Sequence, residues 1–176
     1  MAFQEAWKFL VDSTVKAIKV VSVDNSLVHD GRVFHHKGYH SVANGANLDH
    51  LIVTSNTDVH FRSWQVKSND GPVYISVYEG ATTSANGSAE GVGNTNRQSV
   101  ITPTTSLYLA PTVTGTGSLL INDFIGTTGG GAHTVVGDPA QAMTEWVLKK
   151  NTKYLFRCLN SSGSTTNITV AFSWFE

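Results

Sequence analysis

The sequence contains a single cysteine, Cys158, so no disulfide bond can form within the chain. Charged residues are also scarce, at 14% of the chain, where globular domains usually have roughly 25%. The 12 Lys and Arg residues are scattered, and the formal net charge is −1. Such a chain has no electrostatic attraction to nucleic acid or to an anionic membrane. We therefore expect neither as a partner.

Long hydrophobic runs are missing as well. No apolar run approaches the roughly 20 residues that cross a bilayer. The first residues lack the basic region, apolar run and small-residue cleavage site of a secretory signal. We expect a protein that is not exported, in which Cys158 is a small buried apolar residue.

The sequence does contain segments in which the side chains alternate between two faces with a period of two residues. This pattern is clearest in two apolar runs at 153–159 and 167–175. One face of the first run carries Tyr154, Phe156 and Cys158, and one face of the second carries Ile168, Val170, Phe172 and Trp174. Successive side chains of a strand point to opposite faces, so both runs are expected to be strands. Their proximity predicts an antiparallel hairpin whose apolar face is covered by a second sheet.

The remaining strand-like segments are short and are separated by turn residues, with no amphipathic helical stretches between them. With the two C-terminal runs they make about ten strands, predicted at 15–23, 38–43, 48–55, 59–67, 73–79, 98–103, 106–109, 119–125, 153–159 and 167–175. This arrangement predicts an all-β, antiparallel β-sandwich. A jelly roll is our first choice, and an immunoglobulin-like sandwich is the second.

Three segments are predicted to lie outside the strands. Residues 1–14 form an N-terminal arm or a short helix before a sandwich domain at 15–176, and we favour an arm that docks on a neighbouring subunit. The polar segment 80–96 and the glycine-rich segment 126–137 are expected to be long loops. The turn residues Asp24, Asn25 and Ser26 predict a turn, and Gly38 is expected to interrupt the strand around it.

The histidines raise the question of a metal site. His36 and His40 lie four residues apart, on one face if the backbone is extended, and zinc uses such pairs when further ligands converge. No His-Glu-x-x-His or paired-cysteine motif accompanies them. We interpret them as solvated or hydrogen-bonded loop histidines and assign no metal ligand and no cofactor.

Other catalytic signals are weak. The Gly129–Gly131 run has no Lys of the kind that a phosphate loop needs, and no Gly-x-Ser-x-Gly motif is present. The carboxylates are scattered over turns and strands, so we expect no enzyme. A set of aromatic residues could form a sugar-stacking or protein-contact surface, although core packing is the expected role for most of them: Trp64, Tyr74, Tyr78, Tyr108 and Trp146.

Three stretches carry a resemblance to a known family. They read VHFRSWQVKSNDGPVYISVYEG, TNRQSVITPTTSLYLAPTVTGTG and EWVLKKNTKYLFRCLNSSGSTTNITVAFSWFE. In their order and pattern, over residues 48–176, they resemble virion structural proteins of tailed bacteriophages, in particular small β-sandwich head decoration (cement) proteins. The resemblance rests on no catalytic motif.

The resemblance implies a homotrimer on the outer surface of a bacteriophage head, made in the host cytoplasm, that binds the major capsid protein and stabilises the shell. The arm and the two polar segments are the expected contact regions, with these candidate contact residues: Phe3, Trp7, Phe9, Asn86, Asn94, Arg97, Gly130 and His133. The alternative is a tail- or fibre-associated module that binds a host surface glycan.

Overall fold

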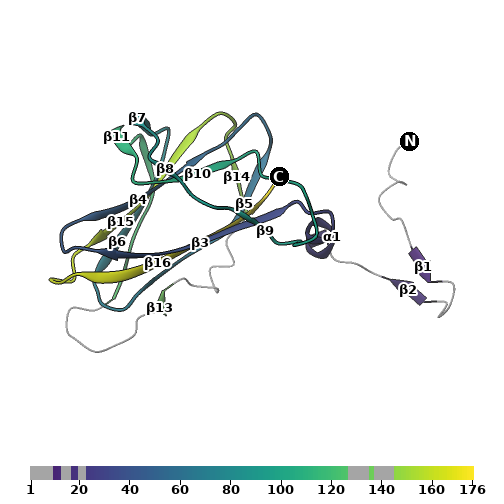
Figure 1. The fold of residues 1–176 in the computed structure, drawn as a ribbon, viewed down its shortest axis with the longest axis horizontal. Coiled ribbons are helices and arrows are strands. Elements are labelled where there is room, and N and C mark those ends of the chain that lie inside the picture. The colour runs from purple at the N-terminus through teal and green to yellow at the C-terminus, as the bar shows by residue number, and fades with distance from the viewer. Residues whose placement is uncertain (1–9, 13–16, 20–22, 127–134, 137–144) are drawn as a thin grey trace.

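The computed structural model describes residues 10–12, 17–19, 23–126, 135–136 and 145–176, and these residues fold mainly into two antiparallel sheets (Figure 1). The strand order in one six-stranded sheet, here called the first sheet, is β12 (Ser118–Ile125), β6 (Val73–Glu79), β15 (Lys153–Asn160), β4 (Asn47–Val53), β10 (Ser106–Leu109) and β8 (Ser88–Ala89). The order in the second sheet is β13 (Val135–Val136), β5 (Val59–Ser68), β16 (Thr166–Phe175), β3 (Val33–Val42) and β9 (Gly93–Asn94), with β14 (Trp146–Leu148) also paired to β5.

The longer strands follow the connectivity of a jelly roll. In chain order, β3, β5, β14 and β16 belong to the second sheet, while β4, β6, β12 and β15 belong to the first. Their spatial orders, β3-β16-β5-β14 and β4-β15-β6-β12, are those of the double-sheet jelly roll. The all-β sandwich prediction and the choice of a jelly roll are therefore confirmed.

The predicted C-terminal hairpin is wrong, although both of its strands are present. β15 pairs with β4 and β6 in the first sheet, whereas β16 pairs with β3 and β5 in the second. Each strand is flanked on both sides, and the turn between them passes from one sheet to the other. Alternation determines which face of a strand is apolar, but it does not determine the strand's neighbours.

The apolar faces of β15 and β16 meet between the two sheets. Phe156 and Phe172 pack edge to face, with ring centroids 5.1 Å apart, and the Phe61 ring lies 6.0 Å from Phe172. All the inward side chains named in these two strands are buried, including Cys158. Since a phenylalanine ring removes a large apolar area from water, this contact is the centre of the core.

A second, smaller apolar cluster covers part of the outer face of the first sheet. Leu51 and Leu155 point away from the main core but are fully buried, because Ala81 and Val113 pack over them. Val113 belongs to β11 (Thr112–Gly115), which pairs with β7 (Thr82–Ala85) in a separate two-stranded sheet. The sandwich thus has a third apolar layer at one place.

The segment 80–96 is not the structureless loop that its composition predicts. It contains β7, β8 and β9, which pair with β11, β10 and β3. The partner strands lie far away in the sequence, so the local pattern of side chains does not predict these pairings. Conversely, the strand predicted at 98–103 is absent, because Asn96 and Ser99 side chains accept hydrogen bonds from the backbone N–H groups two residues on.

Two further predictions are corrected near the start of the sandwich. The turn expected at Asp24, Asn25 and Ser26 lies within the helix α1 (Val23–His29), because these residue types begin helices as readily as turns. Gly38 does not interrupt its strand, since β3 runs through it for 10 residues. All ten β3 positions pair with β16, and this pairing keeps the glycine extended.

The N-terminal arm falls mostly outside the described residues. Within it, β1 (Leu10–Asp12) pairs with β2 (Ala17–Lys19) as a two-stranded sheet. The predicted boundary after residue 14 lies between these two strands. The docking of the arm on a neighbouring subunit stays a prediction.

Candidate functional site

The edge strand β12 carries exposed apolar side chains. The strand predicted at 119–125 exists, but it is not a core strand, because only its last residue, Ile125, is buried. The edge patch consists of Tyr74, Leu119, Leu120 and Phe124, whose exposed fractions run from 44% to 60%. Among the described residues, β12 pairs only with β6, so its other backbone edge is free of strand partners.

Tyr74, Leu119 and Phe124 of the edge patch lie on the outer face of the first sheet, whereas Leu120 lies at the gap between the edges of the two sheets. Phe124 is opposite Tyr74 and Leu119 is opposite Tyr78 in the β12–β6 pairing. The rings of Tyr74 and Phe124 lie 6.2 Å apart. Exposed apolar side chains beside an unpaired strand edge are typical of a protein-contact site, because both the side chains and the backbone edge gain from being covered.

A hollow of about 420 Å³ lies between the edges of the two sheets, where β12 and β14 face each other. Its lining includes Leu120, Trp146 and Glu79. Glu79 accepts hydrogen bonds from Lys149 Nζ (2.6 Å) and from the Tyr154 hydroxyl (2.9 Å). The Lys149 contact, followed by the Tyr154 contact, lowers the pKa of Glu79, so this carboxylate is ionised at neutral pH.

The predicted contact residues that the structure describes are Asn86, Asn94 and Arg97. Asn86 Oδ1 accepts from Lys153 Nζ (2.9 Å), and Asn94 Nδ2 donates to the carbonyl of Gly31 (2.7 Å). These two asparagine side chains thus make hydrogen bonds within the chain, whereas Arg97 is exposed. Phe3, Trp7, Phe9, Gly130 and His133 lie outside the described residues.

The aromatic residues proposed as an exposed surface do not form one. Tyr74 is exposed, but Trp64 packs against Phe156 with ring centroids 5.3 Å apart, and Trp146 packs against the same core. Tyr78 and Tyr108 pack against the outer cluster beneath β11. Core packing is the role of most of this set, as expected.

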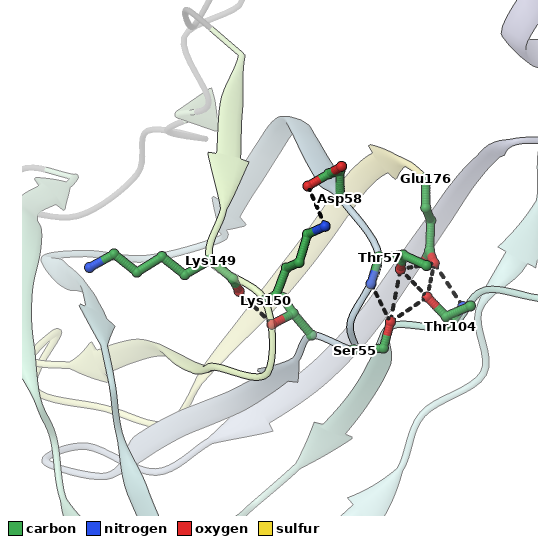
Figure 2. Close-up of polar contacts among 8 residues, drawn as sticks. Ser55, Thr57, Asp58, Thr104, Lys149, Lys150 and Glu176 are labelled. Carbon is green, nitrogen blue, oxygen red and sulfur yellow. Dashed lines mark hydrogen bonds and ion pairs between the residues drawn. The ribbon is translucent and has the colours of Figure 1, made fainter.

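The carboxylate of Glu176 joins three parts of the chain at one end of the sandwich (Figure 2). Its Oε2 accepts from the Thr104 N–H (2.8 Å) and from the Thr104 hydroxyl, and its Oε1 accepts from Thr105 N (3.1 Å) and from Trp174 Nε1 (3.0 Å). The Ser55 hydroxyl donates in turn to Thr104 Oγ1 (2.8 Å). Burial alone would raise the pKa of Glu176, but these hydrogen bonds lower it.

We expect Glu176→Ala to destabilise the protein by about 2 kcal/mol at pH 7, because it leaves several donors without their charged acceptor. A group whose folded pKa is lowered contributes its stability above its unfolded pKa, and that stability is lost as the pH falls through the folded value. Urea denaturation of both proteins should therefore show a difference that shrinks below about pH 4.5. A difference that stays constant from pH 7 to pH 3 would contradict the role of the ionised carboxylate.

Three histidines meet inside the sandwich, which corrects the interpretation of His36 and His40 as loop residues. Both lie on β3, and His50 reaches them from β4 in the opposite sheet. The ring centroid of His50 lies 5.3 Å from that of His40 and 6.0 Å from that of His36. His50 is fully buried and His36 is 5% exposed. The sequence did not predict that His50 joins the other two histidines, because no pattern in its strand distinguishes His50 from its neighbours.

Gly38 makes room for this histidine cluster of His36, His40 and His50. A Cβ atom on Gly38 would lie 2.6 Å from His40 Nε2 and 3.0 Å from His36 Nε2. Burial, together with the neighbouring His40 and His36, lowers the pKa of His50 to about 3. Burial also lowers the pKa of His40, so both rings are neutral at pH 7.

Cys158 is not a reactive thiol. It is fully buried on β15, and burial raises its pKa far above the ordinary value. Because the thiolate is the reactive form, this residue acts as a small apolar side chain, as expected. On the other face of the same strand, Arg157 donates two hydrogen bonds to Asp49, of 2.8 and 2.6 Å.

The fold and these sites define the chain as a double-sheet jelly-roll sandwich with an exposed apolar edge. Comparison with protein-family models, with curated proteins and with solved structures found no match. The resemblance to phage decoration proteins therefore stays a prediction. Among the described residues, no helix is both long enough and apolar enough to cross a membrane.

Proposed function

We propose that this protein is a structural component of a bacteriophage virion that binds the outside of the head and stabilises it through protein–protein contacts. The observation that carries the proposal is the edge patch, in which four exposed apolar side chains lie on and beside an edge strand. Apolar side chains gathered beside an unpaired strand edge are a surface that a protein partner can cover. In this proposal the major capsid protein or a second copy of the chain covers it.

The architecture of the sandwich and its low charge support this role. The double-sheet jelly roll is an architecture that viral capsid domains use, which is an analogy at the level of the fold. Only 14% of the residues are charged, so a large surface can be buried with little desolvation of charge. The arm at residues 1–14 and the trimeric state belong to the same proposal.

The proposal is tested by measuring the amount of this protein in purified particles of the phage that encodes it. We expect many copies per particle, comparable with the number of capsid subunits, detected by quantitative mass spectrometry. A handful of copies would favour a place in the tail. Absence from the particles would overturn the proposal.

The edge patch can be tested separately with Phe124→Ser. We expect at least a tenfold loss of affinity for heads that lack the protein, measured by co-sedimentation, because the substitution removes an exposed aromatic ring from the contact surface. The matched control is Tyr39→Ser, since Tyr39 is 67% exposed and lies on the second sheet. Equal binding by both variants would show that the contact lies elsewhere.

A second candidate is the binding of a host surface glycan, and the hollow between β12 and β14 is the observation that favours it. The lining of this hollow includes the aromatic side chain of Trp146 and the carboxylate of Glu79, a hydrogen-bond acceptor. Aromatic faces and hydrogen-bond acceptors are what sugar rings bind. Titration with host surface polysaccharide, with Trp146→Ala as the comparison, distinguishes this function from head decoration.

A further inference from the structure

The histidine cluster contains buried nitrogen atoms that no other described residue satisfies. His36 Nε2, His40 Nε2 and both ring nitrogens of His50 lack a hydrogen-bond partner among the described residues. Buried polar atoms in native proteins almost always have one. Four such atoms on three neighbouring imidazole rings therefore point to a ligand between them.

The contacts of His36 show which of its nitrogens faces that space. His36 Nδ1 lies 2.9 Å from the carbonyl oxygen of Gly91, to which it donates. In the neutral ring, which is the form that binds a metal, Nε2 then carries a lone pair, and this atom lies 3.8 Å from Glu90 Oε2. Imidazoles that bind metals commonly donate their other N–H to a carbonyl in this way. Two electron-rich atoms that face each other also favour a cation between them.

The spacing of the rings is close to what a metal ion requires. A tetrahedral zinc ion with Zn–N bonds of about 2.1 Å holds its imidazole ring centroids roughly 5 Å apart. The His50 ring lies 5.3 and 6.0 Å from the other two. In the described chain, however, no three His, Cys, Asp or Glu side chains yet stand close enough to hold an ion. Metal binding therefore requires that the half-buried side chains of His40 and Glu90 move toward the other two rings.

We propose that His36, His40, His50 and Glu90 form a structural site for a divalent transition-metal ion of the zinc class. Neutral imidazole and carboxylate are ligands that such ions prefer. The ion joins β3 of the second sheet to β4 of the first and to the segment that precedes β9. Its role is to fasten the two sheets together, and it is independent of the proposed contact with a phage head.

The test uses the full chain without a histidine tag, freed of metal by a chelator. We expect isothermal titration with zinc chloride to show one equivalent bound per chain, and the melting temperature to rise with zinc concentration. Cobalt(II) should give the intense visible absorption of a tetrahedral site. Binding of less than a tenth of an equivalent, with no change in melting temperature, would overturn the proposal.

Variants show whether the ion binds at this cluster. We expect His40→Gln and Glu90→Gln each to weaken zinc binding at least tenfold, and both positions are exposed enough for the variants to fold. His35→Gln is the matched control, because His35 lies on the same strand but is exposed on its outer face. Equal loss of binding in the control, or full binding by both ligand variants, would place the ion elsewhere and reject this site. Circular dichroism confirms that each variant is folded.

Discussion

Phe172→Ala is expected to lower the free energy of unfolding by about 3–5 kcal/mol, the usual range for the loss of a buried phenylalanine ring. Phe172 contacts Phe156 across the sandwich, Phe61 on the neighbouring strand and the ring of His50. The cavity left by the ring would touch both sheets, so neither can close it alone. Urea denaturation followed by tryptophan fluorescence measures the change.

The control for this variant is Phe175→Ala, three residues along the same strand. Phe175 lies on the opposite face, half-buried, and stacks on the His60 ring at 4.4 Å. Its loss should cost about 1 kcal/mol. A similar loss of unfolding free energy for both variants would mean that Phe172 is not packed in the interior between the two sheets.

Leu155→Ala is expected to destabilise the protein by about 3 kcal/mol, although this residue points away from the main core. Leu155 is fully buried in the outer cluster with Leu51 and Ala81. The prediction therefore tests whether the β7–β11 sheet is packed onto the first sheet. Thermal or urea denaturation measures the loss.

Leu159→Ala is the matched comparison on the same face of the same strand. Leu159 is only half-buried, so its truncation removes less apolar area from contact and should cost about 1 kcal/mol. If Leu155→Ala were as mild as Leu159→Ala, the β7–β11 sheet would not cover this face in solution.

The alternation of side chains was enough to predict the apolar faces of β15 and β16, but it could not predict their partners. Strand alternation depends only on local backbone geometry, whereas pairing depends on the whole arrangement of the chain. The same reason explains β7, β8 and β9, whose partners lie far away in the sequence. For β12, an apolar composition predicted burial, yet the strand lies at an edge.

The histidine cluster was predictable only in part. The spacing of His36 and His40 places both on one face of an extended strand, as the structure shows, and Gly38 was wrongly expected to separate them. His50 joins them from the opposite sheet, and that approach exists only in the folded molecule. The edge patch likewise depends on the position of β12 in its sheet, which no local pattern encodes.

The central position of β15 and β16 has a consequence for biosynthesis. Before residues 153–176 have left the ribosome, β3 and β5 have no strand between them, and neither do β4 and β6. Four long strands of the nascent chain therefore stay incompletely paired until residues 153–176 emerge and enter both sheets. Such an intermediate exposes strand edges that attract other chains, so we expect the protein to be most prone to aggregation at this stage of its synthesis.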